Sequence, residues 1–173
     1  QFNQAFVTSG AYKPYVATKY PGKKLAILTC MDTRLTLLLP AALGLKNGDV
    51  KLIKNAGALV SHPYGSVMRS LMICIYEMGI EDILVIGHYD CGMQALSSAA
   101  LTQKMLEAGI QLQTLEQVRA EIDFDQWLAG FDSVGQSVHD TVAQIRAHPL
   151  IPDKIRVSGL IMDPETGRLD LAE

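Results

Sequence analysis

The residue types with the greatest chemical potential lie in two short clusters of this 173-residue chain. Residues 30–34 read Cys-Met-Asp-Thr-Arg, and residues 88–92 read His-Tyr-Asp-Cys-Gly. Two thiols and an imidazole form a soft ligand set that suits zinc, and the spacing from His88 to Cys91 lets one turn supply two ligands. With Cys30 as a third ligand, the residues predict a zinc site formed by Cys30, His88 and Cys91.

Each member of this set also has a simpler interpretation. A single His-x-x-Cys pair is a weak signal, and a cysteine such as Cys30 is more often a small buried apolar residue. A disulfide or a reactive thiol is a further alternative. The presence of two clusters, each after an apolar run and each with charged companions, favours the metal.

A carboxylate and a guanidinium accompany the first cluster. Asp32 could occupy the fourth position on the metal or accept a hydrogen bond from a metal-bound water, and the fork of Arg34 could hold that carboxylate bidentately. The plainer alternative is that Asp32 caps a helix and Arg34 is solvated. In the second cluster, Asp90 could orient a neighbouring group or stabilise the turn.

Charge counting gives an expectation for the pH dependence. Two thiolates and a neutral imidazole leave a zinc site with a formal charge of 0, against +2 for three neutral histidines. Water bound to such a site should be less acidic than at a three-histidine site. We therefore expect an activity that climbs above neutral pH.

The elements that must position these clusters are short strands and amphipathic helices. Residues 25–29, 50–53, 83–86 and 155–161 are β-rich apolar runs bounded by Gly, Asn and Asp, which predict buried strands. Apolar residues at three- and four-residue steps predict one helix from Ser66 to Gly79 and another over 134–145. Alternating strands and helices predict an α/β fold with a mainly parallel sheet flanked by helices.

Further expectations concern the last strand of the sheet and the position of the two clusters relative to the strands. A turn over 163–168 predicts that 169–171 folds back as an added antiparallel edge strand. Both clusters directly follow a strand, and open parallel sheets bind ligands beyond the carboxyl ends of strands where the winding reverses. If the first and third strands are neighbours, Cys30, His88 and Cys91 converge there.

The length and the distribution of aromatic residues indicate the domain organisation. We expect residues 21–173 to form a single zinc-binding α/β domain, since a chain of this size buries a sufficient core in one unit. Residues 1–20 hold half of the ten Phe and Tyr residues. They are expected to form either an arm on a neighbouring subunit or a helix packed on their own domain, and residues 93–130 are expected to be helical and loop cover.

Composition narrows the partners and the compartment. An apolar fraction of 49% and a mean hydropathy of +0.16 indicate apolar surface that a partner subunit covers. The net charge of −3 with scattered Lys and Arg predicts no nucleic-acid partner. No apolar run approaches the ~20 residues of a membrane span, and the first residues lack a signal-peptide pattern, so no membrane association is expected. An odd number of cysteines, three, favours a reducing compartment, hence a cytoplasmic location.

The two clusters resemble the Cys-x-Asp-x-Arg and His-x-x-Cys motifs of the β-class carbonic anhydrases. The likeness covers most of the chain from about residue 20, and the compact length is similar to the short prokaryotic branch; it extends through Gly87, Gly92, Met93, 54–57, 148–152 and 159–163. The resemblance implies a four-stranded parallel sheet with an added antiparallel strand. It also implies a homodimer or dimer of dimers with active sites near the subunit interface.

The resemblance further implies an activity and roles for individual residues. Zinc-bound hydroxide would convert carbon dioxide reversibly to bicarbonate. Asp32 would orient that hydroxide and Arg34 would hold Asp32 off the metal, whereas in a closed form Asp32 would become the fourth ligand. Gly57 is a candidate wall of the substrate site, with a plain turn glycine as the alternative. His62 is the expected proton-transfer residue, ahead of His139 and His148.

Two other functions use the same residues. A carbon disulfide or carbonyl sulfide hydrolase would employ the same zinc site on linear apolar molecules of related shape. A non-catalytic zinc-bound regulatory domain would have Asp32 permanently closing the metal. A thiol redox protein is poorly supported, because Cys30 and Cys91 are far apart in the sequence and no Cys-x-x-Cys is present.

Overall fold

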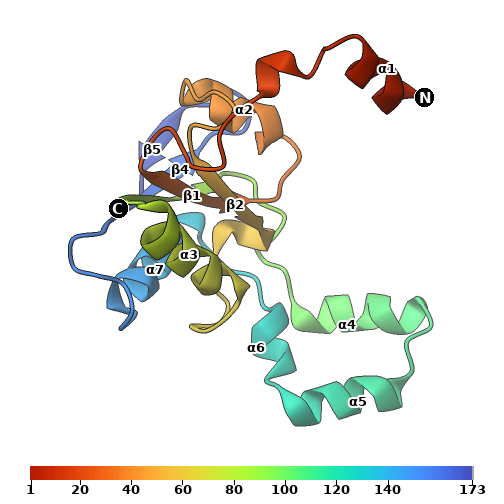
Figure 1. The fold of residues 1–173 in the computed structure, drawn as a ribbon. Coiled ribbons are helices and arrows are strands. Elements are labelled where there is room, and N and C mark those ends of the chain that lie inside the picture. The colour runs from red at the N-terminus through yellow and green to blue at the C-terminus, as the bar shows by residue number, and fades with distance from the viewer. Residues whose placement is uncertain (173) are drawn as a thin grey trace.

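A computed structural model describes residues 1–172, which form a twisted sheet with helices on both of its faces (Figure 1). Within that range the sheet has five strands in the order β2-β1-β3-β4-β5. The mainly parallel four-stranded sheet and its added antiparallel edge strand are thereby confirmed. The parallel strands are β1 (Leu25–Cys30), β2 (Lys51–Asn55), β3 (Asp82–His88) and β4 (Arg156–Met162), and the antiparallel strand is β5 (Leu169–Leu171).

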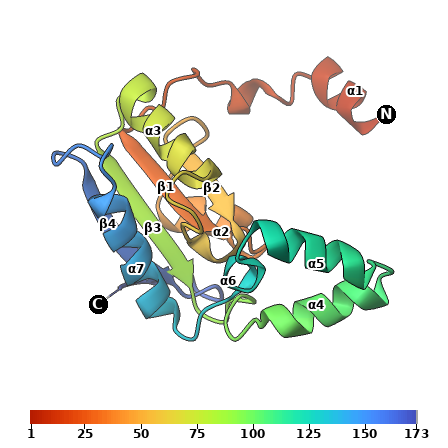
Figure 2. The same ribbon diagram turned by 90° about the horizontal axis from the view of Figure 1, so that it is seen from below.

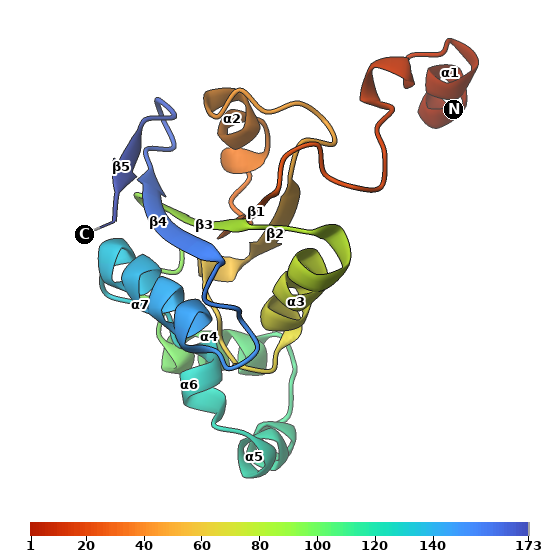
Figure 3. The ribbon, with the colours of Figure 1, turned by 60° about the vertical axis from the view of Figure 1, so that its left-hand side comes forward.

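The helices form layers above and below the sheet. Helix α2 (Leu35–Ala42) lies on one face, and α3 (Ser66–Met78) and α7 (Val134–Ala147) lie on the other, as Figure 3 shows. Helices α3 and α7 are the two that the apolar periodicity predicts. Helix α3 ends at Gly79, where φ is 70°, a left-handed conformation that glycine adopts without steric cost.

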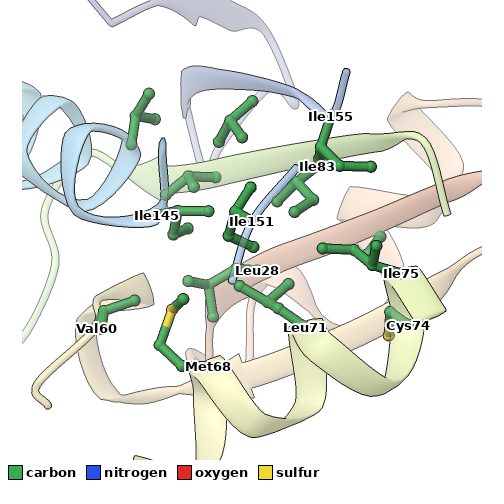
Figure 4. Packing of buried hydrophobic residues seen from close by; sticks show 14 of the residues in the cluster. Leu28, Val60, Met68, Leu71, Cys74, Ile75, Ile83, Ile145, Ile151 and Ile155 are labelled. Carbon is green, nitrogen blue, oxygen red and sulfur yellow. The ribbon is translucent and has the colours of Figure 1, made fainter. Parts of the chain in front are cut away.

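Alternation along the strands fills an apolar layer on each side of the sheet. On the side of α3 and α7, Leu28 of β1 and Ile83 of β3 pack with Leu71 of α3 (Figure 4). On the other side, Ile27 packs with Leu35 of α2. Each such fully buried side chain stabilises the folded state by about 1.5–3 kcal/mol relative to an exposed one. The central strands are therefore a rigid support for the residues at their carboxyl ends.

The central strands β1 and β3 mark the point where the winding of the sheet reverses. The chain runs from β1 outward to β2 through α2, returns to β3 through α3 on the opposite face, and continues to β4. Cys30 is the last residue of β1 and His88 is the last residue of β3. Because β1 and β3 are neighbours, the condition for the convergence of the two clusters is met.

Two segments extend away from this body (Figure 2). The first contains α1 (Phe2–Thr8) and the short helix η1 (Lys13–Tyr15), and neither has a buried residue. The second is a hairpin of α4 (Ser98–Glu107) and α5 (Leu112–Glu121), from which α6 (Phe124–Leu128) leads back to the body. Among residues 1–172, no helix is long and apolar enough to cross a bilayer.

The hairpin corrects one expectation from the sequence. Residues 93–130 are largely helical as predicted, but α4 and α5 do not cover the sheet. Helix α4 contains no buried residue and Leu115 alone is buried in α5. Apolar residues recur at three-residue steps in α5, at Leu112, Leu115 and Val118, but of these Leu115 alone is buried.

Candidate metal centre

Cys30, His88 and Cys91 come together beyond the carboxyl ends of β1 and β3. One potential ligand atom from each residue lies within 4.8 Å of the others, and all three residues are buried. The sulfur atoms of Cys30 and Cys91 are 3.9 Å apart, against about 2.05 Å in a disulfide, and both thiols are free. The structure thus assembles the predicted ligand set and does not contain the alternative disulfide.

The imidazole of His88 has one nitrogen engaged and one without a partner. Its Nδ1 donates a hydrogen bond to the carbonyl oxygen of Tyr89 at 2.8 Å. Its Nε2 is buried and has no hydrogen-bond partner among the described residues. A buried polar atom left in this way is costly, and a metal ion that accepts its lone pair removes the cost. The bond to the Tyr89 carbonyl therefore leaves Nε2 as the nitrogen of His88 that could hold a metal ion.

The two thiols of the cluster ionise differently. Burial raises the pKa of Cys30, but the neighbouring imidazole of His88 and the backbone of Gly57 and Asp32 outweigh it and lower the pKa to about 7. Burial dominates at Cys91 and raises its pKa to about 11. Burial opposes a charged His88, yet the neighbouring Cys30 raises the pKa of this imidazole. A metal ion would release the protons held here, because thiol and imidazole ligands bind deprotonated.

Asp32 and Arg34 form a bidentate pair beside the cluster. The Nε and Nη2 groups of Arg34 donate to Oδ1 and Oδ2 of Asp32 at 3.1 Å and 2.9 Å, and the Arg34 backbone N–H donates to Oδ1 at 2.8 Å. These bonds lower the pKa of Asp32 to about 2. Oδ2 of Asp32 lies 3.7 Å from Nε2 of His88. Arg34 is therefore paired rather than free in solvent, and its carboxylate partner lies next to His88 of the cluster.

Asp90 also contacts Arg34, a partner that the sequence did not identify. Its carboxylate accepts a hydrogen bond from Nη1 of Arg34 at 2.9 Å, and its backbone carbonyl accepts one from Nη2 at 2.9 Å. Asp90 has a φ of 53°, which few residues with a Cβ adopt. Of the two interpretations left open, the contact with a neighbouring side chain is present in the structure. Its position between two ligands was the signal available in the sequence.

Gly57 lies in the short helix η2 (Ala56–Ala58), directly after β2. Its φ is 86°, and a Cβ there would lie 3.1 Å from Leu59 and Phe131 and 3.3 Å from Met93. Its backbone also contributes to the lowered pKa of Cys30. The turn interpretation therefore describes its backbone, and the neighbouring side chains are apolar, as the expected substrate wall requires.

The remaining histidines lie outside the three-residue cluster. His62 lines a cavity of about 360 Å³ together with Met93. Its Nδ1 accepts a hydrogen bond from the backbone of Tyr64 at 3.0 Å, which places its proton on Nε2. His148 is buried at the end of α7, and His139 is an exposed residue of that helix. Of these three histidines, His62 alone lines a cavity together with Met93, which follows Cys91 by two residues.

Comparison with known proteins agrees with this geometry. The family model described as carbonic anhydrase matches residues 25–169. "Putative carbonic anhydrase YvdA" of Bacillus subtilis (strain 168) is 51% identical over 172 residues, which cover 99% of this chain and 87% of that protein. A carbon disulfide hydrolase of Acidithiobacillus thiooxidans is 31% identical over 85% of this chain and 76% of its own length.

The fold is also found in a crystal structure. The β-carbonic anhydrase isoform I of Trichomonas vaginalis superposes with a TM-score of 0.90 and 33% identity, covering 99% of this chain and 93% of that one. The matched range runs from β1 to β5 and contains both clusters. The chain therefore belongs to the β-carbonic anhydrase family.

Proposed function

We propose that this chain catalyses the reversible hydration of carbon dioxide to bicarbonate, using a zinc ion held by Cys30, His88 and Cys91. The observation that carries the proposal is the buried cluster of two thiols and an unpartnered imidazole nitrogen. A carboxylate held by Arg34 lies beside that cluster. Membership of the carbonic anhydrase family supports the substrate.

The ligand atoms suit zinc in chemistry and in spacing. Thiolate and imidazole are the ligands that zinc prefers in proteins. Two sulfur atoms at about 2.3 Å from a tetrahedral ion lie about 3.8 Å apart, and Cys30 and Cys91 are separated by 3.9 Å. When bound, zinc lowers the pKa of a coordinated water and so supplies a nucleophile at accessible pH.

The residues around the cluster bind and orient the reactants. Asp32 is ionised across the working range because its pKa is held at about 2. Its oxygens retain lone pairs beyond those used by Arg34, so Asp32 accepts a hydrogen bond from the reacting water and aims that water at the substrate. Gly57 and Met93 contribute an apolar wall against which carbon dioxide, a small apolar molecule, lies.

Turnover also requires a proton to leave the reacting water, and we assign this transfer to His62. The assignment is supported by the cavity that His62 shares with Met93 and by a free Nε2 on its ring. In weak buffer, His62→Ala should lower turnover, and added imidazole buffer should restore it. Unchanged turnover of His62→Ala in weak buffer would remove this residue from the scheme, and His139→Ala is the matched control.

A second candidate is the hydrolysis of carbonyl sulfide or carbon disulfide at the same centre. The observation that favours it is the 31% identity with a carbon disulfide hydrolase. The zinc ligands do not distinguish these linear molecules, because each would be attacked by the same nucleophile. Parallel turnover measurements on carbon dioxide and carbonyl sulfide, on one zinc-replete sample, decide between them. We expect the higher kcat/KM with carbon dioxide, and preference for carbonyl sulfide would overturn the assignment.

A third candidate is a non-catalytic zinc-bound domain, in which Asp32 closes the metal. It predicts zinc-dependent stability without hydration at any pH. In the structure both carboxylate oxygens of Asp32 accept hydrogen bonds from Arg34, which favours the open arrangement. Equimolar zinc together with hydration activity would exclude this candidate.

We further propose that the chain acts as a homodimer or dimer of dimers in the cytoplasm. Residues 1–20 expose large aromatic side chains, among them Phe2 at 86% and Tyr15 at 63%, which a second copy would cover. The separate domain 21–173 then carries the zinc site. The three free cysteines support a reducing compartment.

A further inference from the structure

Arg34 is held from two sides in this structure. A guanidinium has five N–H donors in a rigid plane. Nε and one N–H of Nη2 bind the carboxylate of Asp32. Nη1 binds the carboxylate of Asp90, and the other N–H of Nη2 binds the carbonyl oxygen of Asp90. Two residues, one from each cluster, therefore fix the plane and the rotation of the guanidinium.

The two partners of Arg34 lie on different sides of its guanidinium group, Asp32 toward the cluster and Asp90 toward solvent. Asp32 is close to the ligands, with Oδ2 at 3.7 Å from the unpartnered Nε2 of His88. At this distance the carboxylate competes for the open position of a metal held by the cluster. The carboxylate of Asp90 faces outward and its side chain is 87% exposed. Asp90 thus contacts the guanidinium from the solvent side and is not part of the three-residue cluster.

The backbone of Asp90 is placed for this contact. Its φ of 53° is a left-handed conformation that is unfavourable for most residues other than glycine, asparagine and aspartate. Asp90 stands between His88 and Cys91, so the same turn that supplies two ligands also presents a carbonyl and a carboxylate to Arg34.

We propose that Asp90 is a positioning residue, which locks the guanidinium of Arg34 in the orientation that holds Asp32 away from the metal. The proposal deepens the function given above and rests on its metal site. Without Asp90, two of the four hydrogen bonds of the guanidinium are lost or weakened, and Arg34 can follow Asp32 toward the ligands. The fraction of sites with an open coordination position then falls. Because the Asp90 carboxylate is exposed, the effect is modest, about threefold.

The test is the binding of thiocyanate to cobalt(II)-loaded protein, followed by visible absorption. Thiocyanate needs an open coordination position, so its affinity reports the fraction of sites that Asp32 leaves open. Asp90→Gly removes the carboxylate, keeps the carbonyl and suits the left-handed backbone. Asp90→Asn keeps one neutral acceptor for Nη1. We expect thiocyanate to bind about threefold more weakly to Asp90→Gly, with Asp90→Asn intermediate.

The direction of the change distinguishes positioning from simple electrostatics. Removal of a negative charge near the site would by itself strengthen the binding of an anion. A weakening therefore identifies an effect that acts through Asp32. In an Asp32→Ala background no carboxylate is present to occupy the metal, so Asp90→Gly should there leave thiocyanate affinity unchanged or raise it.

Asp82→Asn is the matched control. Asp82 forms a comparable bidentate pair with Arg156 at the opposite end of β3, and its loss should leave thiocyanate affinity unchanged. Equal or tighter thiocyanate binding by both Asp90 variants at equal cobalt content would overturn the proposal, and so would weakening that persists in the Asp32→Ala background. If Asp90→Gly does not hold cobalt, Asp90→Asn decides alone.

The measurement is independent of the proposed reaction. A protein that binds cobalt and shows the predicted thiocyanate shift, but does not hydrate carbon dioxide, would contradict the proposed function and support the role of Asp90. A protein that hydrates carbon dioxide but shows no thiocyanate shift would support the proposed function and contradict the role of Asp90.

Discussion

Cys30 and Cys91 are both buried, yet their surroundings make them different acids. Hydrogen bonds bring the pKa of Cys30 to about 7, whereas burial raises that of Cys91 to about 11. The third cysteine, Cys74, belongs to the buried face of α3 and packs in the core, and burial raises its pKa as well. Three buried cysteines of one chain thus divide into two candidate ligands and one apolar core residue.

This division can be tested by removing one cysteine at a time. Cys91→Ala should lower zinc affinity by more than about 100-fold, since it removes a ligand rather than a supporting group. Cys74→Ala should keep equimolar zinc, because its sulfur lies in the core. Metal content after dialysis against a chelator, measured on folded protein, provides the comparison. Equal loss of zinc from both variants would show that the ligand assignment is wrong.

The Asp32 carboxylate gives a pH-dependent prediction. Its pKa is about 2 in the folded protein, below the 3.8 of an unperturbed aspartate. A carboxyl group with a lowered pKa stabilises the folded state above its unfolded pKa, and this stabilisation is lost as the pH falls toward the folded pKa. Metal-free Asp32→Asn should therefore be less stable than the parent by about 1–2 kcal/mol above pH 5, with the difference shrinking toward pH 2.

Urea unfolding of both proteins in the presence of a chelator measures this difference. If the difference in unfolding free energy between the two proteins stays constant as the pH falls, the stabilisation by Asp32 does not depend on the charge of its carboxylate. Asp82→Asn supplies a reference, because the pKa of Asp82 is also lowered by an arginine, Arg156, but far from the cluster.

At the scale of elements, the site depends on how closely α7 approaches β3. Gly87 directly precedes His88, and a Cβ on it would lie 2.7 Å from Cγ2 of Val138 and 2.9 Å from Cγ2 of Val134. Both valines belong to α7. The absence of a side chain at Gly87 therefore allows α7 to pack against the end of β3 that carries His88, a candidate ligand.

Gly87→Ala should force these elements apart. We expect a loss of about 1–3 kcal/mol in unfolding free energy, the usual cost of overpacking, together with weaker zinc binding through the displacement of His88. Val138→Ala in the same chain creates space, so the double variant should lose less than the sum of the two single variants. Additive losses in chemical denaturation would contradict this packing account.

Much of this arrangement could be predicted from the sequence. Short β-rich runs and three- and four-residue apolar steps define β1, β3, α3 and α7 because each buries a continuous apolar face. The order of the strands brings Cys30 and His88 together, and a topological rule was sufficient to anticipate it. The projection of α4 and α5 could not be predicted, since local helix signals do not say what a helix packs against.

The same limit applies within the site. The contact between Asp90 and Arg34 depends on a left-handed backbone at Asp90 and on a pairing across 56 residues of sequence. Neither is encoded in a local pattern. The orientation of His88 by the Tyr89 carbonyl likewise depends on a backbone atom, which every residue type would supply.

At the scale of the whole molecule, the exposed aromatic residues of the N-terminal segment require an explanation. Helix α1 buries no residue, although Phe6 and Tyr15 pack against each other with ring centroids 6.3 Å apart. The segment is fastened to the body by polar contacts, such as the hydrogen bond from Lys51 Nζ to the carbonyl of Lys19 at 2.8 Å. Its apolar surface is consistent with a role between subunits.

Removal of residues 1–20 should weaken the proposed homodimer by at least about tenfold, that is, about 1.4 kcal/mol. Light scattering coupled to size-exclusion chromatography over a range of concentrations measures the change in mass. The comparison protein is the full chain with Phe2→Ser, which should show a smaller effect. An unchanged mass at every concentration would assign the contacts between copies to other surfaces.

We propose that zinc held by Cys30, His88 and Cys91 makes this chain an active carbonic anhydrase. Stopped-flow hydration of carbon dioxide between about pH 6.5 and pH 9, with zinc measured on the same sample, tests it most directly. We predict activity that depends on zinc, climbs above neutral pH and falls in Asp32→Ala. Zinc-replete protein without activity at the upper end of this range would contradict the account.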